Sequence, residues 1–245
     1  ENRQKYQDRF IVLEGASTGS SKSNFMYLIE QALKYRIDYF FFADQDDVWL
    51  RQKVKVMMKK MKEVEVAEKP CVIFSDMKVV DENLNEIAPS FFNYINANPE
   101  RIMPNQLIMQ SFIAGCSMLV NRKTAELSIY YTNIDNIFMH DWWMALIGSY
   151  IGKIFCIKEP LVLYRQHGNN QIGARPLKKI ELLRHLFDTL FGDHKEEIKS
   201  RVLRGRNFAE ELKYVPGLTD EQHEFLDQFS KLGKENKAKR IGFYL

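Results

Sequence analysis

Apolar runs of strand length alternate with stretches of helical periodicity over the first two thirds of the chain. Short apolar runs bounded by polar turns are typical of buried strands, whereas apolar positions three and four residues apart are typical of amphipathic helices. The strand-like runs lie at residues 10–13, 37–43, 70–76, 77–80, 153–157 and 161–164, and the helical patterns at 25–33, 53–66 and 142–150. This alternation predicts an α/β fold with a sheet flanked by helices.

Two of the predicted helices carry more detailed expectations. Ser21 or Ser23 is expected to cap the helix at 25–33. In the helix at 53–66, one face is expected to be apolar and the other to carry the lysines; the apolar residues are Val54, Met57, Met58 and Met61. Methionines in this arrangement are expected to fill the core rather than to bind a ligand.

After residue 177 the pattern contains helices only. An apolar stripe runs through residues 180–191, and Thr219 with Gln222 fits a capping box ahead of another amphipathic helix. This change predicts a boundary near residue 175, with an α/β domain at 1–175 and an all-helical C-terminal appendage at 176–245.

Composition indicates an ordinary globular chain. Of 245 residues, 45% are hydrophobic and 27% are charged, and the net charge of +3 is spread without a basic stripe, so nucleic acid is not an expected partner. Three scattered cysteines in apolar stretches form neither a disulfide framework nor a zinc motif, which favours reduced thiols in a cytoplasmic protein. No apolar run has the length of a membrane span, and no signal peptide is visible.

The strongest chemical signal is the acidic turn Asp44-Gln45-Asp46-Asp47-Val48-Trp49, which follows the apolar run at 37–43. Three carboxylates at one strand end repel one another unless a cation lies beside them. Mg²⁺ or Mn²⁺ would fit, because hard divalent ions prefer carboxylate oxygens and also bind phosphates. The alternative is that Asp46 or Asp47 caps the following helix.

Other polar groups also flank apolar elements and are candidates for the same crevice. They are Asp76, the pair His140-Asp141 and the loop from Arg165 to Asn170. A carboxylate can act as general base on an incoming hydroxyl, while Arg165 and His167 can supply positive charge to a diphosphate leaving group. Together these residues indicate group transfer from a nucleotide-activated donor.

Three segments in this order resemble a known family. They are the run at 39–49, the segment His140-Asp141-Trp142-Trp143, and the loop Tyr164-Arg165-Gln166-His167-Gly168-Asn169-Asn170. The chain is similar here to family 2 glycosyltransferases, and most similar to rhamnosyltransferase-like members from bacteria, over residues 10–172. The resemblance implies a GT-A fold, a Rossmann-like mixed sheet between helices, and a metal-dependent reaction that inverts the anomeric centre.

The resemblance also assigns roles. Asp141 would be the catalytic base, Asp46 the direct metal ligand, and Asp44 would face the ribose or the water shell of the metal. Positions near the nucleotide, the diphosphate or the metal would be Lys22, Asn24, Arg165 and His167, and the cleft for donor sugar and acceptor would include Gly115, Cys116 and Trp142.

Structural alternatives stand beside these roles. Asp141 would serve equally well as a helix N-cap, His167 as a loop hydrogen-bonding residue and Arg165 as a surface ion pair. Trp142 and Trp143 are expected to be mostly core, with at most one facing an acceptor. Asp76 is expected chiefly to organise the end of its strand.

One departure concerns the N-terminal part of the family pattern. Members have strands and an acidic turn that hold the nucleotide base, and nothing of that kind precedes Phe10. We therefore expect the first part of the nucleotide pocket to be missing from this chain through omission, since a sheet without those strands would expose apolar surface.

The predicted function is transfer of a sugar, with rhamnose from a dTDP donor as one option, to a polysaccharide or lipid-linked acceptor in bacterial cell-surface glycan synthesis. The alternatives are a nucleotidyltransferase and a non-catalytic scaffold of a polysaccharide assembly complex. Lipid-linked acceptors would bring peripheral contact with the inner face of the cell membrane. The apolar stripes of the tail are expected to pack on the catalytic domain or to form a homodimer.

Overall fold

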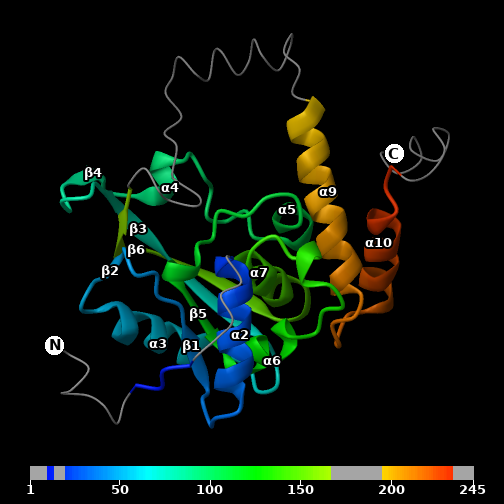
Figure 1. Cartoon of the computed structure of the whole chain (residues 1–245), viewed down its shortest axis with the longest axis horizontal. Coiled ribbons are helices and arrows are strands. Elements are labelled where there is room, and N and C mark those ends of the chain that lie inside the picture. The colour runs from blue at the N-terminus through cyan, green and yellow to red at the C-terminus, as the bar shows by residue number, and fades with distance from the viewer. Residues whose placement is uncertain (1–9, 14–19, 167–194, 234–245) are drawn as a thin grey trace.

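A computed structural model describes residues 10–13, 20–166 and 195–233 (Figure 1). The strands are β1 (Tyr39–Phe41), β2 (Val48–Trp49), β3 (Cys71–Val80), β4 (Glu86–Ala88), β5 (Met118–Asn121) and β6 (Lys153–Arg165). The helices are α2 (Ser21–Leu33), α3 (Lys53–Val64), α4 (Phe91–Tyr94), α5 (Pro104–Leu107), α6 (Arg122–Ser128), α7 (His140–Ile151), α9 (Lys195–Leu212) and α10 (Asp220–Ser230), with 3-10 turns η2 (Gly115–Ser117) and η3 (Ile134–Asn136).

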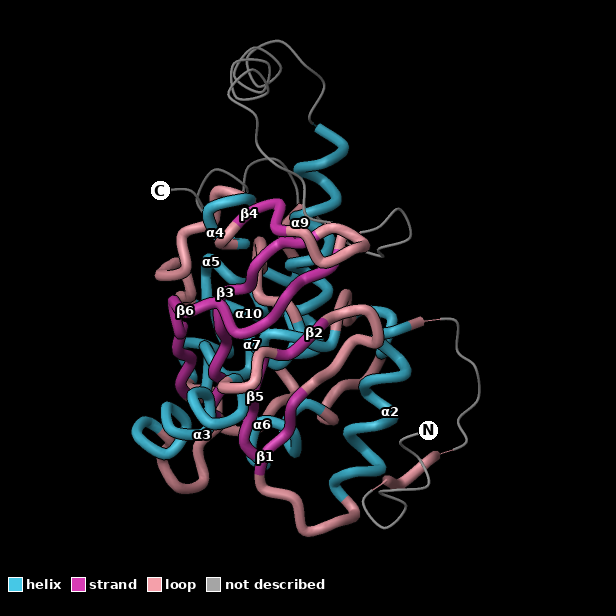
Figure 2. The backbone as a smooth tube through the Cα atoms, turned by 90° about the vertical axis from the view of Figure 1, so that its left-hand side faces the viewer, coloured by secondary structure: helices cyan, strands magenta, loops and turns pink. Residues whose placement is uncertain are grey.

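The strands form one mixed sheet in the order β1-β5-β3-β6-β2, and β4 pairs with β3 at its far end (Figure 2). β3 and β6 are parallel, and the other pairs are antiparallel. A mixed sheet flanked by helices confirms the predicted fold class.

Alternate residues of the central strands supply two apolar layers. Cys71 and Ile73 of β3 pack with Met57 and Met61 of α3, whereas Val72 and Phe74 belong to the larger cluster under α2, α6 and α7. Side chains of a strand point to opposite faces in turn, so a sheet covered on both sides needs apolar residues at every position. This explains why residues 70–74 are all apolar.

Several local predictions differ from the structure. Residues 10–13 are irregular, with exposed Phe10, Ile11 and Val12, and Ser20 rather than Ser21 or Ser23 is the N-cap of α2. The run that was expected to end at Asp76 continues to Val80, and the two runs around Pro160 form one strand, because register shifts beside Asp76 absorb the irregularity.

The carboxylate of Asp76 has the organising role that the sequence indicates. It is buried, and it accepts hydrogen bonds from the backbone N–H groups of Met77, Phe91 and Phe92 and from the Ser90 hydroxyl. Asp76 thus fastens the start of α4 to β3, and all its recorded partners are structural.

The described part of the tail packs on the α/β part through one continuous core. Phe208 of α9 lies against Trp142 and Trp143 of α7, with ring centroids 5.1 and 6.3 Å apart, and α10 packs along α9 (Figure 1). Thr219 and Gln222 form the predicted capping box of α10. The helix predicted at 180–191 lies outside the described residues, and none of the described helices is both long and apolar enough to span a membrane.

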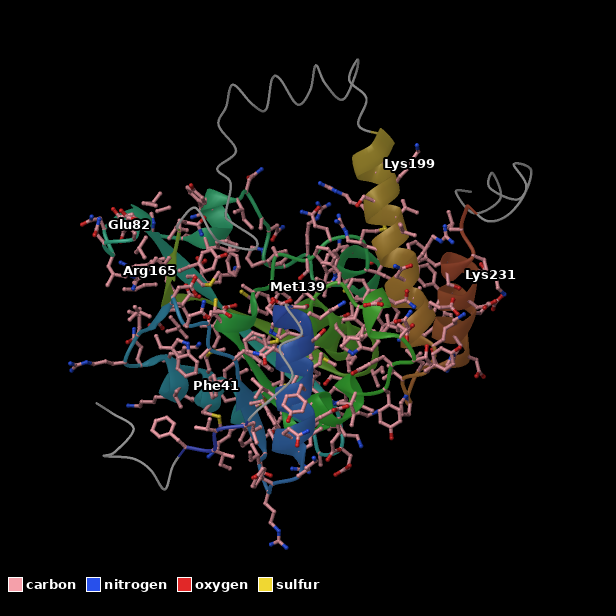
Figure 3. All side chains as sticks on the ribbon, viewed as in Figure 1. Phe41, Glu82, Met139, Arg165, Lys199 and Lys231 are labelled. Carbon is pink, nitrogen blue, oxygen red and sulfur yellow. The ribbon has the colours of Figure 1, made fainter. Side chains whose placement is uncertain are left out.

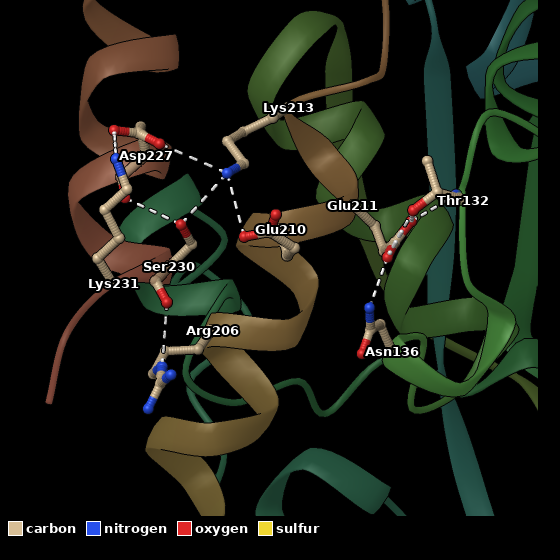
Figure 4. Close-up of polar contacts among 9 residues, drawn as sticks. All are labelled: Thr132, Asn136, Arg206, Glu210, Glu211, Lys213, Asp227, Ser230 and Lys231. Carbon is tan, nitrogen blue, oxygen red and sulfur yellow. Dashed lines mark hydrogen bonds and ion pairs between the residues drawn. The ribbon is translucent and has the colours of Figure 1, made fainter. Parts of the chain in front are cut away.

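A buried carboxylate ties α9 to the loop that precedes α7. Glu211 is 0% exposed. It accepts hydrogen bonds from the backbone N–H and hydroxyl of Thr132 and from the Asn136 amide (Figure 4). It also accepts the backbone N–H of Asn133. Charge-assisted bonds to a buried carboxylate are strong, so this contact holds the C-terminal end of α9 against the loop.

Replacing Glu211 with Gln is expected to lower the free energy of unfolding by about 2–4 kcal/mol. The glutamine amide has only one acceptor oxygen in place of two, so some of the buried donors lose their hydrogen bond. Urea denaturation measures the loss. The matched control is Glu210→Gln on the same helix, where the side chain is half exposed and pairs with Lys213; its expected cost is below about 1 kcal/mol. Equal costs for the two variants would contradict the anchoring role.

Candidate functional site

The acidic turn lies between β1 and β2 and faces η2. The carboxylates of Asp44 and Asp47 and the thiol of Cys116 each offer one atom within 4.8 Å of the others. Asp47 Oδ1 accepts the backbone N–H of Arg165 at 3.0 Å, which fastens the turn to the end of β6. The N-cap of α3 is Gln52, so Asp47 supports the turn and does not cap that helix.

The carboxylates of the turn lie in an environment that disfavours their charge. Burial and then the charges of Asp47, Asp46 and Asp141 raise the pKa of Asp44 to about 6. Burial also raises the pKa of Asp47, against the lowering effect of its contacts with Cys116 and Arg165. Since Asp141 acts on Asp44, the structure brings the acidic turn and the predicted base into one electrostatic site.

Lys53 lies beneath this turn, and the sequence did not predict it as part of the site. It is 0% exposed, and its ammonium donates to the backbone carbonyl of Cys116 and lies 3.7 Å from the centroid of the Trp49 ring. Burial lowers its pKa to about 8, although Asp47 and Asp44 act in the opposite direction. The predicted orientation of this helix is therefore wrong at two positions, since Lys53 points inward and Val54 is exposed.

A signal for Lys53 was present in the sequence. Lys53, Met57 and Met61 recur at intervals of four residues, and the two methionines are fully buried. Residues four apart share one face of a helix. The buried face therefore continues to the first turn of α3, where it reaches Trp49 and the acidic turn.

Asp141 lies in the first turn of α7, with Met139 at the N-cap. Its Oδ2 accepts the backbone N–H of Gly115 at 2.8 Å, and its Oδ1 accepts the N–H of Trp142 at 2.7 Å. A carboxylate oxygen has a second lone pair, so both oxygens remain able to accept a hydroxyl proton. The bond to Gly115 joins α7 to the η2 turn that also contacts Asp47 and Lys53.

His140 packs at the contact between α7 and η2. The imidazole is buried, stacks on Phe25 with ring centroids 4.2 Å apart and lies 5.4 Å from Phe42. Burial lowers its pKa, so the neutral ring is favoured. The ring leaves room only for a glycine opposite, because a Cβ on Gly115 would lie 2.8 Å from His140 Nε2.

Gly115→Ala is therefore expected to displace His140 or η2 and to cost about 1–3 kcal/mol of stability, the usual cost of overpacking. Because the shift would also move the N–H that binds Asp141, the variant should lose activity as well. Thermal unfolding measures the first effect. An unchanged midpoint would show that this close approach does not constrain the site.

The other predicted site residues are distributed differently. The ammonium of Lys22 donates to the Ile134 carbonyl at 2.8 Å, and Asn24 is exposed on α2. The guanidinium of Arg165 donates to the Glu82 carbonyl at 3.0 Å, and the two residues lie side by side (Figure 3). His167 lies outside the described residues.

Both tryptophans of α7 are in the core. Trp142 is 8% exposed, and its indole N–H donates to the Leu107 carbonyl; that of Trp143 donates to the Ser128 carbonyl. Trp142 packs against Phe208 rather than lining an open cleft. Cys116 is buried with its Sγ 3.6 Å from Met77 Sδ. None of the three cysteines is disulfide-bonded, as predicted.

The donor set fits a hard divalent cation. Asp47 Oδ2 is buried and receives no hydrogen bond from any described residue, and Asp44 lies beside it. Such oxygens are the ligands that Mg²⁺ and Mn²⁺ prefer. Burial and neighbouring carboxylates hold the pKa of Cys116 well above its usual range, so its protonated thiol is a poor ligand.

A comparison with curated proteins finds a similar sequence. The dTDP-rhamnosyl transferase RfbG of Shigella flexneri is 26% identical over 162 residues, which cover 64% of this chain and 52% of that protein. The chain therefore spans about half the length of this relative. No protein-family profile matches the chain.

Proposed function

We propose that this chain carries the catalytic centre of a metal-dependent, inverting glycosyltransferase with a GT-A type of sheet. The donor would be a nucleoside-diphosphate sugar, with dTDP-rhamnose as the first candidate, since the similar protein is a dTDP-rhamnosyl transferase. The acceptor would be a glycan or a lipid-linked glycan. The observation that carries the proposal is the meeting of the acidic turn with Asp141 at η2, where Cys116 lies against Asp44 and Asp47 and the N–H of Gly115 donates to Asp141.

In this proposal the acidic turn holds Mn²⁺ or Mg²⁺. Asp44 and Asp47 offer the converging oxygens, and Asp46 remains the predicted direct ligand because of its place in the Asp-x-Asp motif. The cation, when bound, would neutralise charge on the diphosphate. The side chains of Trp142, Lys22 and Arg165 have no role in this proposal, because they donate to backbone carbonyls of the fold.

Asp141 is the proposed base. It would take the proton of the acceptor hydroxyl while that oxygen attacks the anomeric carbon of the donor. The bond from that carbon to the diphosphate oxygen breaks, and the nucleoside diphosphate leaves with the electron pair. Hydrogen bonds from the backbone N–H groups of Gly115 and Trp142 hold the carboxylate in place.

Release of nucleoside diphosphate from a panel of nucleotide sugars tests the proposal. The intact protein should release it from one of them in the presence of Mn²⁺. In Asp46→Ala the rate should fall by about a hundredfold or more and no longer respond to Mn²⁺. If no nucleotide sugar is consumed, the chain is a scaffold rather than an enzyme; if Asp46→Ala still responds as the wild type does, Asp46 is not a ligand.

A further inference from the structure

Lys53 is the one element of the site whose role neither the motif nor the proposed reaction explains. It is the first residue of α3 and is among the largest fully buried side chains of the described chain. Its ammonium is enclosed by the Cys116 carbonyl, the Trp49 ring and the Phe41 ring, whose centroid is 5.8 Å away. Because it is 0% exposed, a substrate cannot touch it.

A buried ammonium is costly unless its surroundings compensate the charge. The carbonyl and the indole face provide part of the compensation. The Lys53 ammonium donates to the carbonyl of Cys116, the residue whose thiol lies within 4.8 Å of the carboxylates of Asp44 and Asp47. Among the described residues it has no ion pair at close range, and both carboxylates attract it electrostatically. Lys53 therefore acts on the two carboxylates together rather than pairing with one of them.

The acidic turn contains several carboxylates whose negative charges repel one another. The charges of Asp47, Asp46 and Asp141 disfavour the ionised form of Asp44, and the charge of Asp46 disfavours that of Asp47. A positive charge under the turn reduces this repulsion and is present whether or not a metal is bound. A divalent cation that arrives later meets a site in which part of the negative charge is already compensated.

We infer that Lys53 is a positioning residue, the built-in counter-charge of the acidic turn: it holds the carboxylates together without metal and lowers the affinity of the turn for a divalent cation. The first half depends only on residues of this chain. The second half rests on the proposed metal site.

A double-mutant cycle tests the first half without metal or substrate. Lys53→Met keeps most of the side-chain volume and removes the charge, so it should lower the urea midpoint of the metal-free protein. Adding Asp47→Asn should recover part of that loss, because one uncompensated carboxylate disappears. The control cycle pairs Asp47→Asn with Lys59→Met, whose side chain is 79% exposed on the same helix, and should be additive. Additivity in the Lys53 cycle would overturn the inference.

Mn²⁺ binding, followed by electron paramagnetic resonance without nucleotide, tests the second half. Lys53→Met should bind Mn²⁺ about tenfold more tightly than the wild type, while Lys53→Arg and Lys59→Met should stay within about twofold. Unchanged or weaker binding by folded Lys53→Met would overturn the competition. If Lys53→Met does not fold, Lys53→Met/Asp47→Asn is compared with Asp47→Asn, and tighter binding by the double variant is expected. If the wild type binds no Mn²⁺, the proposed metal site and this second half both fail, and the stability cycle alone decides the first half.

Discussion

Asp141→Asn is expected to reduce sugar transfer at saturating donor by about a thousandfold while leaving donor affinity within a fewfold of the wild type. Loss of a general base typically costs a factor of 10² to 10⁴. The asparagine oxygen can still accept one of the two N–H groups that Asp141 binds, from Gly115 or Trp142, so the fold should persist. Steady-state rates together with donor binding by calorimetry separate the two effects.

The matched control for this prediction is Asp135→Asn. Asp135 is exposed on η3, a few residues before α7, and its replacement should leave transfer unchanged. The assignment of Asp141 as base would be wrong if its variant turned over at the wild-type rate. Equal losses of transfer and of donor binding would instead make Asp141 a structural cap of the η2 turn.

Asp44→Asn is expected to stabilise the metal-free protein and to remove its response to Mn²⁺. Burial and the neighbouring carboxylates make the ionised form of Asp44 unfavourable and raise its pKa to about 6. An amide of the same shape avoids that repulsion. At pH 8 the expected gain is about 1–2 kcal/mol, after a discount for the part of the side chain that stays in contact with water.

The gain should depend on pH in a defined direction. The folded-state pKa of Asp44 lies above the ordinary value of 3.8, so the folded protein holds this proton to higher pH than the unfolded chain does. Below about pH 4 the group is protonated in both states and causes no penalty. As the pH rises through about 6 the folded state must ionise it, and stability is lost. The advantage of Asp44→Asn should therefore be full at pH 8 and absent at pH 4.

Thermal unfolding at pH 4 and pH 8, with and without Mn²⁺, measures both parts of this prediction. Asp38→Asn serves as the control, because Asp38 is exposed at the opposite end of β1. A variant that is less stable than the wild type at pH 8 would show that Asp44 is stabilised by contacts rather than strained by charge.

The parts of the fold that could be predicted are those in which local pattern and tertiary environment agree. The run at 70–76 predicts a buried strand, which β3 is, and the helix predicted at 142–150 is present as α7. The capping box at Thr219 follows from local hydrogen bonding alone. In contrast, the short β1 and β2 and the continuous β3 and β6 depend on pairing across the sheet, which no local pattern contains.

In the site, too, local sequence predicts some features and tertiary packing decides the others. The need for a cation beside the acidic turn follows from three carboxylates in four residues, and the structure supplies one such cation in Lys53. The four-residue spacing with Met57 and Met61 could have indicated this lysine, but charge on a helix usually indicates a solvated face. Trp142 and Trp143 were expected to be mostly core, and both are buried, with Trp142 packed against Phe208.

The proposed function requires that a divalent cation and a nucleoside diphosphate bind together at the acidic turn. The most direct measurement is a calorimetric titration of dTDP into the intact protein, with and without Mn²⁺, for the wild type and for Asp44→Asn/Asp46→Ala. We expect the wild type to bind dTDP at least tenfold more tightly with Mn²⁺ and the double variant to show no such difference. The same Mn²⁺-dependent binding in the double variant would contradict the account.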